Sequence, residues 1–257
     1  MTATAGPLRD TVALVTGASS GIGAATARAL AAEGAAVALL GRRRERLEEL
    51  ADELRGEGGT ASVVAADITD RSRAAEAVEA VVSELGRLDT VVNNAGTMGV
   101  GPVEDSPLDE WERMIEINVR GLLYVTHAAL PHLLRAAESS PRGVADLVNI
   151  SSTAGRVARP GTAVYNLTKF GVNGFTEALR QEVVRKRVRV SVVEPGTVDT
   201  ELSSHLRDGA REAVERQVEG LELLRPEDIA DAVSYIVTRD RRVAVNEILV
   251  RASDQTW

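Results

Sequence analysis

A tyrosine and a lysine, Tyr165 and Lys169, stand four residues apart in the segment YNLTK. On a helix this spacing places both side chains on one face. The segment follows an apolar run that ends in Ser151 and Ser152, so a hydroxyl, a phenol and an ammonium are expected at one edge of the fold. Reduction of a carbonyl needs a proton donor for the oxygen as hydride reaches the carbon. The constellation therefore indicates proton transfer to or from a carbonyl or alcohol oxygen.

The phenol of Tyr165 has to be activated for this task, because a free phenol has a pKa of about 10. We expect Lys169 to favour the phenolate through its positive charge, as an oxidised nicotinamide would. Ser152 is suited to hold the substrate oxygen by a hydrogen bond. A Tyr/Lys pair at this spacing also occurs by chance on helix surfaces, and that interpretation is the alternative.

A glycine-rich turn, TGASSGIG, links the first apolar run to the first helical pattern. Its glycines, Gly17, Gly21 and Gly23, form GxxxGxG, which is one residue longer than the dinucleotide fingerprint GxGxxG. Glycines allow a tight turn and a close approach to a pyrophosphate, and the following helix presents its N–H groups to the anion. The turn therefore predicts a dinucleotide site, with an ordinary loop as the alternative.

The residues after the second apolar run bear on the choice of cofactor. An enzyme that uses NAD usually has Asp or Glu about 20 residues after the glycines, but this chain has Gly41 followed by three arginines. An arginine fork can hold a 2′-phosphate that a carboxylate would repel. We therefore expect NADP(H), held mainly by Arg42 and secondly by Arg43, with help from Ser19 or Ser20. A solvated, basic helix start is the alternative.

The residues at the ends of the third and fourth apolar runs are further candidates for contact with the cofactor. Asp67 is placed to bond the adenine amino group, although it could instead cap the next helix, a role for which Thr69 competes. The fourth run ends in NNAG at Asn93–Gly96, where small residues would let the backbone approach the cofactor.

The elements that must position these groups alternate regularly between strand and helix. Apolar runs predict strands over 12–16, 36–40, 61–66, 88–92, 144–150, 188–193 and 246–250. Helical patterns cover 21–33, 43–55, 71–85, 107–137 with a bend near Pro131, 163–186 and 226–238. Such alternation predicts an α/β, doubly wound Rossmann-type fold with a seven-stranded parallel sheet. We expect one domain over 1–257, with a substrate lid at about 197–224.

Composition excludes several other classes of protein. The chain has 257 residues, no cysteine and a net charge of −8, which excludes thiol chemistry and argues against general nucleic-acid binding. The three histidines form no metal-ligand motif, and no metal is expected. The chain shows neither a signal-peptide pattern nor an apolar stretch of about 18 residues. We therefore expect a cytoplasmic protein without a membrane partner.

The motifs TGASSGIG, NNAG, YNLTK after a serine, and PGTVDT follow one another in an order that closely resembles the short-chain dehydrogenase/reductase family, over residues 8–250. The family's serine lies 13 residues before the tyrosine, which selects Ser152 over Ser151. The resemblance also implies that Asn118 distorts its helix and holds a water linking Lys169 to solvent. It implies that Lys169 bonds the nicotinamide ribose and that the chain forms dimers or tetramers through its two long helices.

The resemblance extends the expected sites. The stretch 195–200 matches the family segment that touches the nicotinamide amide, through Val198 and Thr200. The expected catalytic residues are Asn118, Ser152, Tyr165 and Lys169. The expected cofactor-binding residues are Gly17, Ser19, Ser20, Gly21, Ile22, Gly23, Arg42, Arg43, Asp67, Ile68, Asn94, Ala95, Gly96, Tyr165, Lys169, Pro195, Gly196, Val198 and Thr200. The expected substrate-binding residues are Met98, Ser152, Val157, Tyr165, Leu202 and His205.

The sequence thus predicts an NADP(H)-dependent oxidoreductase acting on a small aldehyde, ketone or 3-hydroxy acid. The segment VNEILVR resembles a subgroup that includes clavaldehyde reductases and 3-hydroxy acid dehydrogenases. Two alternatives stay open: a cofactor-binding regulator or scaffold of the same fold, and an epimerase or lyase that recycles its nicotinamide.

Overall fold

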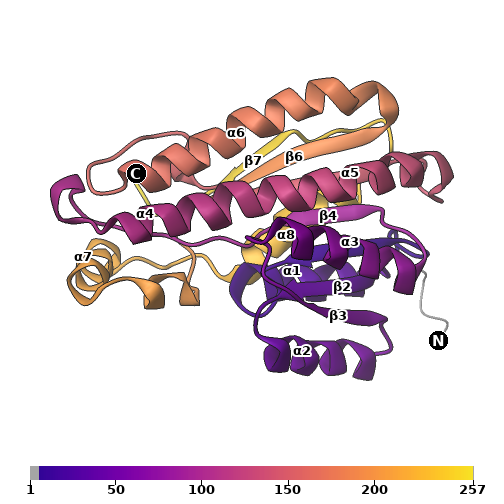
Figure 1. Cartoon of the computed structure of the whole chain (residues 1–257), viewed down its shortest axis with the longest axis horizontal. Helices are drawn as coiled ribbons and strands as arrows, with labels where there is room; N and C mark the ends of the chain where they lie inside the picture. Colours follow the sequence, from indigo (N-terminus) through magenta and orange to yellow (C-terminus); the bar gives the residue numbers. More distant parts are fainter. Residues whose placement is uncertain (1–5, 257) are drawn as a thin grey trace.

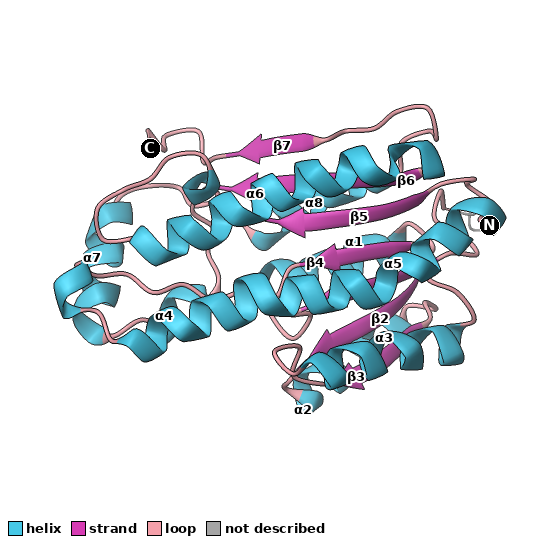
Figure 2. Cartoon of the chain, turned by 45° about the horizontal axis from the view of Figure 1, so that its top comes forward, coloured by secondary structure: helices cyan, strands magenta, loops and turns pink. Residues whose placement is uncertain are grey.

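The computed structural model describes residues 6–256, and its strands form one seven-stranded sheet. The order is β3-β2-β1-β4-β5-β6-β7, and every neighbouring pair is parallel (Figure 2). The expected Rossmann-type sheet is confirmed. The strands are β1 (Val12–Thr16), β2 (Ala36–Gly41), β3 (Ala61–Ala65), β4 (Thr90–Asn93), β5 (Ala145–Ile150), β6 (Val188–Pro195) and β7 (Glu247–Val250).

Helices cover both faces of the sheet, which gives three layers (Figure 1). Successive side chains of a strand point to opposite faces, and β1 shows this directly. Ala13 and Val15 pack on one side, with α1 (Gly21–Ala32), α2 (Arg44–Gly56) and α8 (Pro226–Val237). Val12 and Leu14 pack on the other, with α3 (Arg71–Leu85), α5 (Leu122–Ser139) and α6 (Ala163–Val183). A strand buried on both faces needs an almost unbroken apolar sequence, as VALVT is.

The strand order reverses between β1 and β4, because the chain runs outward from β1 to β3 and then returns to the other side of β1. Ligands of open α/β sheets bind outside the carboxyl ends of the strands at such a switch point. The glycine turn after β1 and the NNAG segment after β4 both lie at this edge.

The long helical region predicted over 107–137 contains an irregular segment that its helical pattern did not predict. It consists of α4 (Leu108–Ile115), a π-helical segment (Glu116–Gly121) and α5. Pro131 lies inside α5, which continues as a helix to Ser139, so the helix does not end at the proline. The irregular turn instead contains Asn118, and π segments of this kind often occur at functional sites.

The segment expected to be a lid forms the 3-10 helix η5 (Glu201–His205) and α7 (Asp208–Val218). Its two ends are joined by a parallel bridge between Val198 and Leu224, where the Asp199 amide donates to the Leu224 carbonyl at 2.8 Å. In Figure 1, α7 stands apart from the two helix layers, beyond one end of the sheet. The segment 197–224 is therefore an arm whose two ends are held together at its base.

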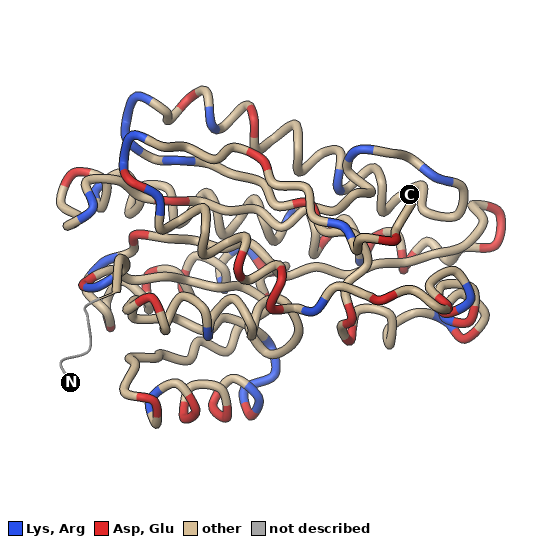
Figure 3. Tube along the Cα trace, turned by 180° about the vertical axis from the view of Figure 1, so that it is seen from behind, with Lys and Arg blue, Asp and Glu red and all other residues tan. Residues whose placement is uncertain are grey.

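Charged residues of both signs are interspersed along the chain (Figure 3). The charges around the site must therefore be judged from their individual partners. No helix within residues 6–256 is both long enough and apolar enough to cross a membrane.

Candidate active site

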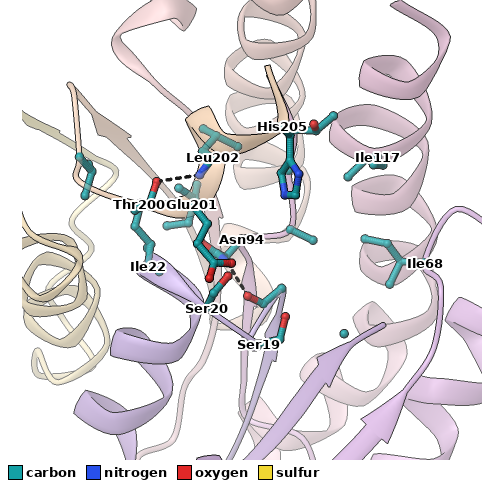
Figure 4. A pocket seen from close by; sticks show the side chains of 18 of the residues that line it. Ser19, Ser20, Ile22, Ile68, Asn94, Ile117, Thr200, Glu201, Leu202 and His205 are labelled. Atoms are coloured by element: carbon teal, nitrogen blue, oxygen red, sulfur yellow. Dashed lines mark hydrogen bonds between the residues drawn. The ribbon is translucent and has the colours of Figure 1, made fainter. Parts of the chain in front are cut away.

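A cavity at the carboxyl edge of the sheet contains most of the residues expected from the sequence (Figure 4). Every expected cofactor residue except Gly23 lines it, as do Ser152, Leu202 and His205. Gly23 instead lies beneath the turn, where a Cβ atom would be 2.3 Å from the Gly17 carbonyl oxygen. Its small size serves the packing of the turn rather than the lining of the cavity.

The glycine turn is held from below by the NNAG segment. The Thr16 hydroxyl accepts hydrogen bonds from the backbone amides of Asn94 and Ala95, each at 3.0 Å, and the Asn94 side-chain amide donates to the Thr16 carbonyl at 3.0 Å. Gly17 has a φ of +67°, and a Cβ atom there would lie 2.9 Å from Ala95 Cα. Only glycine allows this approach without strain.

The first turn of α1 faces the cavity with its N–H groups available. Ser20 is the residue that precedes the helix, and its side chain makes no capping hydrogen bond. Uncapped N–H groups and the positive end of the helix dipole suit an anion such as a pyrophosphate.

Arg43 crosses the turn and is fixed by two serine hydroxyls. Its Nε and Nη2 atoms contact Ser19 Oγ at 3.1 and 2.9 Å, and Nη2 contacts Ser20 Oγ at 2.6 Å. Arg42 lines the same cavity, and no residue between 6 and 256 makes a hydrogen bond or ion pair with its guanidinium. Both arginines thus line the cavity, but of the two only Arg43 is held there by hydrogen bonds to other described residues.

Asp67 lines the cavity and does not cap the following helix. Its Oδ1 atom accepts from the Thr69 amide at 3.0 Å and from the Thr69 hydroxyl at 2.8 Å. The helix cap is Asp70, which accepts from the amides of Ser72 and Arg73. The alternative in which Asp67 or Thr69 caps α3 is therefore wrong.

The catalytic candidates gather where β5 ends and α6 begins. Tyr165 and Lys169 are on the first turns of α6 and are 8% and 7% exposed. Ser152 follows β5, and its hydroxyl oxygen accepts from the Ala154 amide at 3.1 Å. A hydrogen bond also links Ser152 to the phenol of Tyr165. Ser151 also borders the cavity, but it is buried and its hydroxyl donates to the carbonyl of Lys169 at 3.4 Å rather than to the phenol. The geometry thus separates the two serines that the residues alone could not.

The electrostatics around Tyr165 differ from expectation. Burial raises the pKa of the phenol, and the hydrogen bond from Ser152 opposes that rise. Burial also lowers the pKa of Lys169 to about 8. The ammonium donates to the Ile150 carbonyl at 3.0 Å and lies 5.7 Å from the centre of the Tyr165 ring. In this arrangement Lys169 does not bring the phenol pKa down, because both groups are desolvated and the lysine bonds elsewhere.

Asn118 lies under the site and joins three segments. Its Oδ1 atom accepts from the Thr97 amide at 2.8 Å, and its Nδ2 atom donates to the Thr97 carbonyl at 2.9 Å and to the Thr168 hydroxyl at 3.2 Å. The π-helical turn presents this side chain to the end of NNAG and to the helix that carries Lys169. Asn118 is 2% exposed and does not line the cavity.

The substrate candidates are only partly brought together. Leu202 and His205 belong to η5 and line the cavity (Figure 4). Met98 lines a smaller neighbouring cavity that it shares with His205. Val157 is 47% exposed and does not line the main cavity. Ile117 and Glu201 do line it and were missed, since neither belongs to a motif with a recognisable spacing.

The loop that carries Ser152 is anchored to the sheet by a buried acid. Glu194 at the end of β6 is fully buried and accepts from Arg156 at 2.5–2.8 Å and from the Asn173 amide at 2.6 Å. Arg156 also pairs with Glu247 of β7 at 2.6 Å. Both carboxylates raise the pKa of Arg156. No group of three side chains suited to a metal ion occurs in the part of the chain that the structure describes.

Known proteins resemble this chain over nearly its whole length. Glycine betaine reductase of Emericella nidulans is 40% identical over 252 residues, which are 97% of this chain but 19% of that protein. An uncharacterized oxidoreductase of Staphylococcus epidermidis is 36% identical over 95% of this chain and 98% of its own length. This chain therefore spans about a fifth of the first relative and nearly all of the second.

Solved structures agree with these relatives. The closed form of serine dehydrogenase complexed with NADP⁺ has a TM-score of 0.87 at 34% identity, covering 96% of this chain and 97% of that one. The 3-ketoacyl-(acyl-carrier-protein) reductase of Brucella melitensis complexed with NADH has a TM-score of 0.83 at 31% identity, covering 96% and 98%. The family model described as short chain dehydrogenase matches residues 11–211. With its tyrosine, lysine and serine at the end of a glycine-lined cavity, the chain belongs to the short-chain dehydrogenase family of oxidoreductases.

Proposed function

We propose that this protein is an NADP(H)-dependent reductase or dehydrogenase that acts on a small aldehyde, ketone or 3-hydroxy acid. One observation carries the proposal. A single cavity joins the Ser152–Tyr165–Lys169 cluster to a glycine turn bordered by Arg42 and Arg43. The end at Ser152, Tyr165 and Lys169 can transfer a proton to or from a substrate oxygen. The end at the glycine turn can hold a dinucleotide.

The residues of the turn fit such a cofactor. Gly17 and Gly21 have positive φ angles, +67° and +52°, and a Cβ atom at Gly17 would lie 2.9 Å from Ala95 Cα, so glycine allows the tight turn that borders the cavity. The α1 N–H groups suit a pyrophosphate, and Asp67 Oδ2 has no intramolecular hydrogen bond within the described residues. When bound, a nicotinamide supplies or accepts the hydride.

The protein's own groups would manage the proton. Ser152 holds the substrate oxygen, and Tyr165 gives its phenolic proton to that oxygen in the reductive direction. Lys169, with a pKa of about 8, exchanges protons readily near neutral pH and can restore the one that Tyr165 loses. Asn118 holds the backbone at Thr97 and the helix at Thr168 in fixed relation around this exchange.

The preference for NADP(H) rests on charge. No acidic residue follows β2 where an NAD enzyme usually has one, and two arginines line the cavity there. The two structural relatives above are complexes with NADP⁺ and with NADH, so family membership alone does not select the cofactor. The arginines of this chain favour the phosphorylated one.

Nicotinamide absorbance with a panel of aldehydes, ketones and 3-oxo acids tests the proposal. Turnover faster with NADPH than with NADH is expected. Equal turnover with the two cofactors would contradict the cofactor preference. Tight NADPH binding with no turnover on any substrate would point instead to a regulator, and product without a net absorbance change to an epimerase or lyase.

We also propose that the protein is a cytoplasmic homo-oligomer. Its two long helices, α5 and α6, expose Leu123, Leu167 and Phe170, of which Leu167 is 64% exposed. Apolar side chains on the same pair of helices suit burial against a second copy. Sedimentation of the purified protein tests the oligomeric state, and a monomer at micromolar concentration would contradict the proposed homo-oligomer.

A further inference from the structure

The lid is clamped on both sides of the cavity by ion pairs. On one side, Glu201 Oε2 contacts Arg43 Nη1 at 2.8 Å and Glu201 Oε1 contacts Arg46 Nη1 at 2.6 Å. On the other side, Arg207 Nε contacts Glu110 Oε1 of α4 at 2.8 Å. The first clamp joins the lid to the start of α2, where the cofactor preference is expected to be set.

The carboxylate of Glu201 lies within the group of residues that would receive an anion. Glu201, Ser19, Ser20, Arg42 and Arg43 all line the main cavity. Figure 4 shows the Glu201 side chain reaching down from the lid toward the turn that carries Ser19 and Ser20. One edge of the Arg43 guanidinium holds the two serine hydroxyls, and its remaining nitrogen holds Glu201.

We propose that Glu201 is a cofactor-specificity residue, an internal anion that competes with the 2′-phosphate of NADP(H) for Arg43 and weakens the preference that the arginines create. The inference rests on the proposed function, because it assigns the 2′-phosphate to the arginines after β2. Glu201 would then have to release Arg43, or bear the repulsion of a neighbouring dianion, whenever a phosphorylated cofactor binds.

The chemistry of the two anions supports competition. Arg43 and Arg46 hold the pKa of Glu201 down at about 2, so the carboxylate is charged throughout the neutral range. A phosphate monoester also carries more than one negative charge there. Two such anions a few ångströms apart repel even in water. An unphosphorylated ribose brings no charge, and its hydroxyls can donate to a carboxylate, as in many NAD enzymes.

The test separates the 2′-phosphate from the rest of the cofactor. Binding of 2′,5′-ADP, 5′-AMP, NADPH and NADH is measured by calorimetry for the wild type and for Glu201→Gln. The glutamine keeps the shape of the side chain and can still accept from the arginines, but it removes the charge. We expect 2′,5′-ADP and NADPH to bind about tenfold more tightly to the variant, which corresponds to about 1.4 kcal/mol. Binding of 5′-AMP and NADH should change by less than about twofold.

Glu110→Gln is the matched control, because it removes the charge from the other clamp of the same lid. If loosening the lid were the cause, Glu110→Gln and Glu201→Gln would have similar effects on all four ligands. That outcome would overturn the inference, as would an unchanged ratio of NADPH to NADH affinity in Glu201→Gln. Weaker binding of 2′,5′-ADP to Glu201→Gln would also overturn it, since Glu201 would then assist the phosphate site.

Different results would contradict the proposed cofactor preference and the role of Glu201. A wild-type protein that binds NADH as tightly as NADPH contradicts the proposed cofactor preference. The effect of Glu201 is read from the change in the affinity ratio between wild type and variant, whatever the ratio in the wild type is. A strong wild-type preference that Glu201→Gln leaves unchanged would refute the role of Glu201 alone.

Discussion

The ammonium of Lys169 lies 5.7 Å from the centre of the Tyr165 ring, yet its hydrogen bond goes to the carbonyl of Ile150 at 3.0 Å. Both side chains are almost wholly buried, and burial shifts their pKa values in opposite directions, upward for the phenol and downward to about 8 for the ammonium. Burial thus favours the neutral form of each group. A neutral phenol is the form that can give a proton to a carbonyl oxygen.

Removing the phenol should abolish most turnover. Tyr165→Phe keeps the ring in its buried place and deletes only the proton donor. We expect kcat to fall about 10²–10⁴-fold, the usual contribution of a general acid, and the Kd for NADPH to stay nearly unchanged. Steady-state kinetics and calorimetry measure the two quantities. Near-normal turnover would show that another group donates the proton.

Lys169→Ala should damage both catalysis and cofactor binding, because Lys169 is expected to exchange protons and to bond the nicotinamide ribose. Loss of one hydrogen bond from a charged group corresponds to about 1.5–3 kcal/mol, or roughly 10–100-fold in the Kd for NADPH. Tyr165→Phe serves as the comparison. An unchanged NADPH affinity in Lys169→Ala would show that Lys169 does not bond the nicotinamide ribose.

The buried lysine should also make stability depend on pH. Burial lowers the Lys169 pKa from 10.5 to about 8, so between these values the unfolded chain binds more protons at this position than the folded one. The free energy of unfolding should therefore gain a contribution that rises with pH from about 8 to 10.5. Denaturant unfolding of wild type and Lys169→Met over this range measures it. The stability advantage of Lys169→Met should shrink as pH increases, and a constant difference would contradict the lowered pKa.

Substitution of Arg42 should weaken the binding of NADPH while leaving that of NADH nearly unchanged. Arg42 has no hydrogen bond or ion pair to any residue from 6 to 256, so Arg42→Gln leaves no internal partner unpaired. We expect it to raise the Kd for NADPH about tenfold and to change that for NADH little. Arg44→Gln is the control, because Arg44 pairs with Glu48 at 3.2 Å and does not line the cavity. Equal effects of the two variants would place the phosphate elsewhere.

Arg156 should stabilise the loop of Ser152 through Glu194. Arg156→Met leaves a fully buried carboxylate without its main ion-pair partner. The expected loss of stability is about 2 kcal/mol, less than for a wholly buried pair because the Arg156 side chain is 39% exposed. Thermal unfolding measures this loss, and kcat should fall as Ser152 moves. Arg180→Met, which breaks an exposed pair with Glu177, should have little effect on either.

The sequence by itself determined the order of the elements and named the residues that are candidates for the site. Short apolar runs such as VALVT, placed between longer helical patterns, indicate strands buried on both faces, and period-3.6 patterns such as Leu47, Leu50 and Leu54 mark the helices between them. The local sequence did not identify Asp70 as the N-cap of α3, because Asp67, Thr69 and Asp70 offer the same capping chemistry within four residues.

Only the tertiary structure decided which of these groups meet. Glu201 and Arg43 are separated by 158 positions, and no local pattern announces their contact. The side chain of Asn118 forms hydrogen bonds with Thr97 and Thr168, which lie far from it in the sequence. The pKa shifts of Tyr165 and Lys169 arise from burial, which is a property of the packed chain. Periodicity and turn chemistry act over a few residues, whereas contacts and desolvation exist only after the layers have closed.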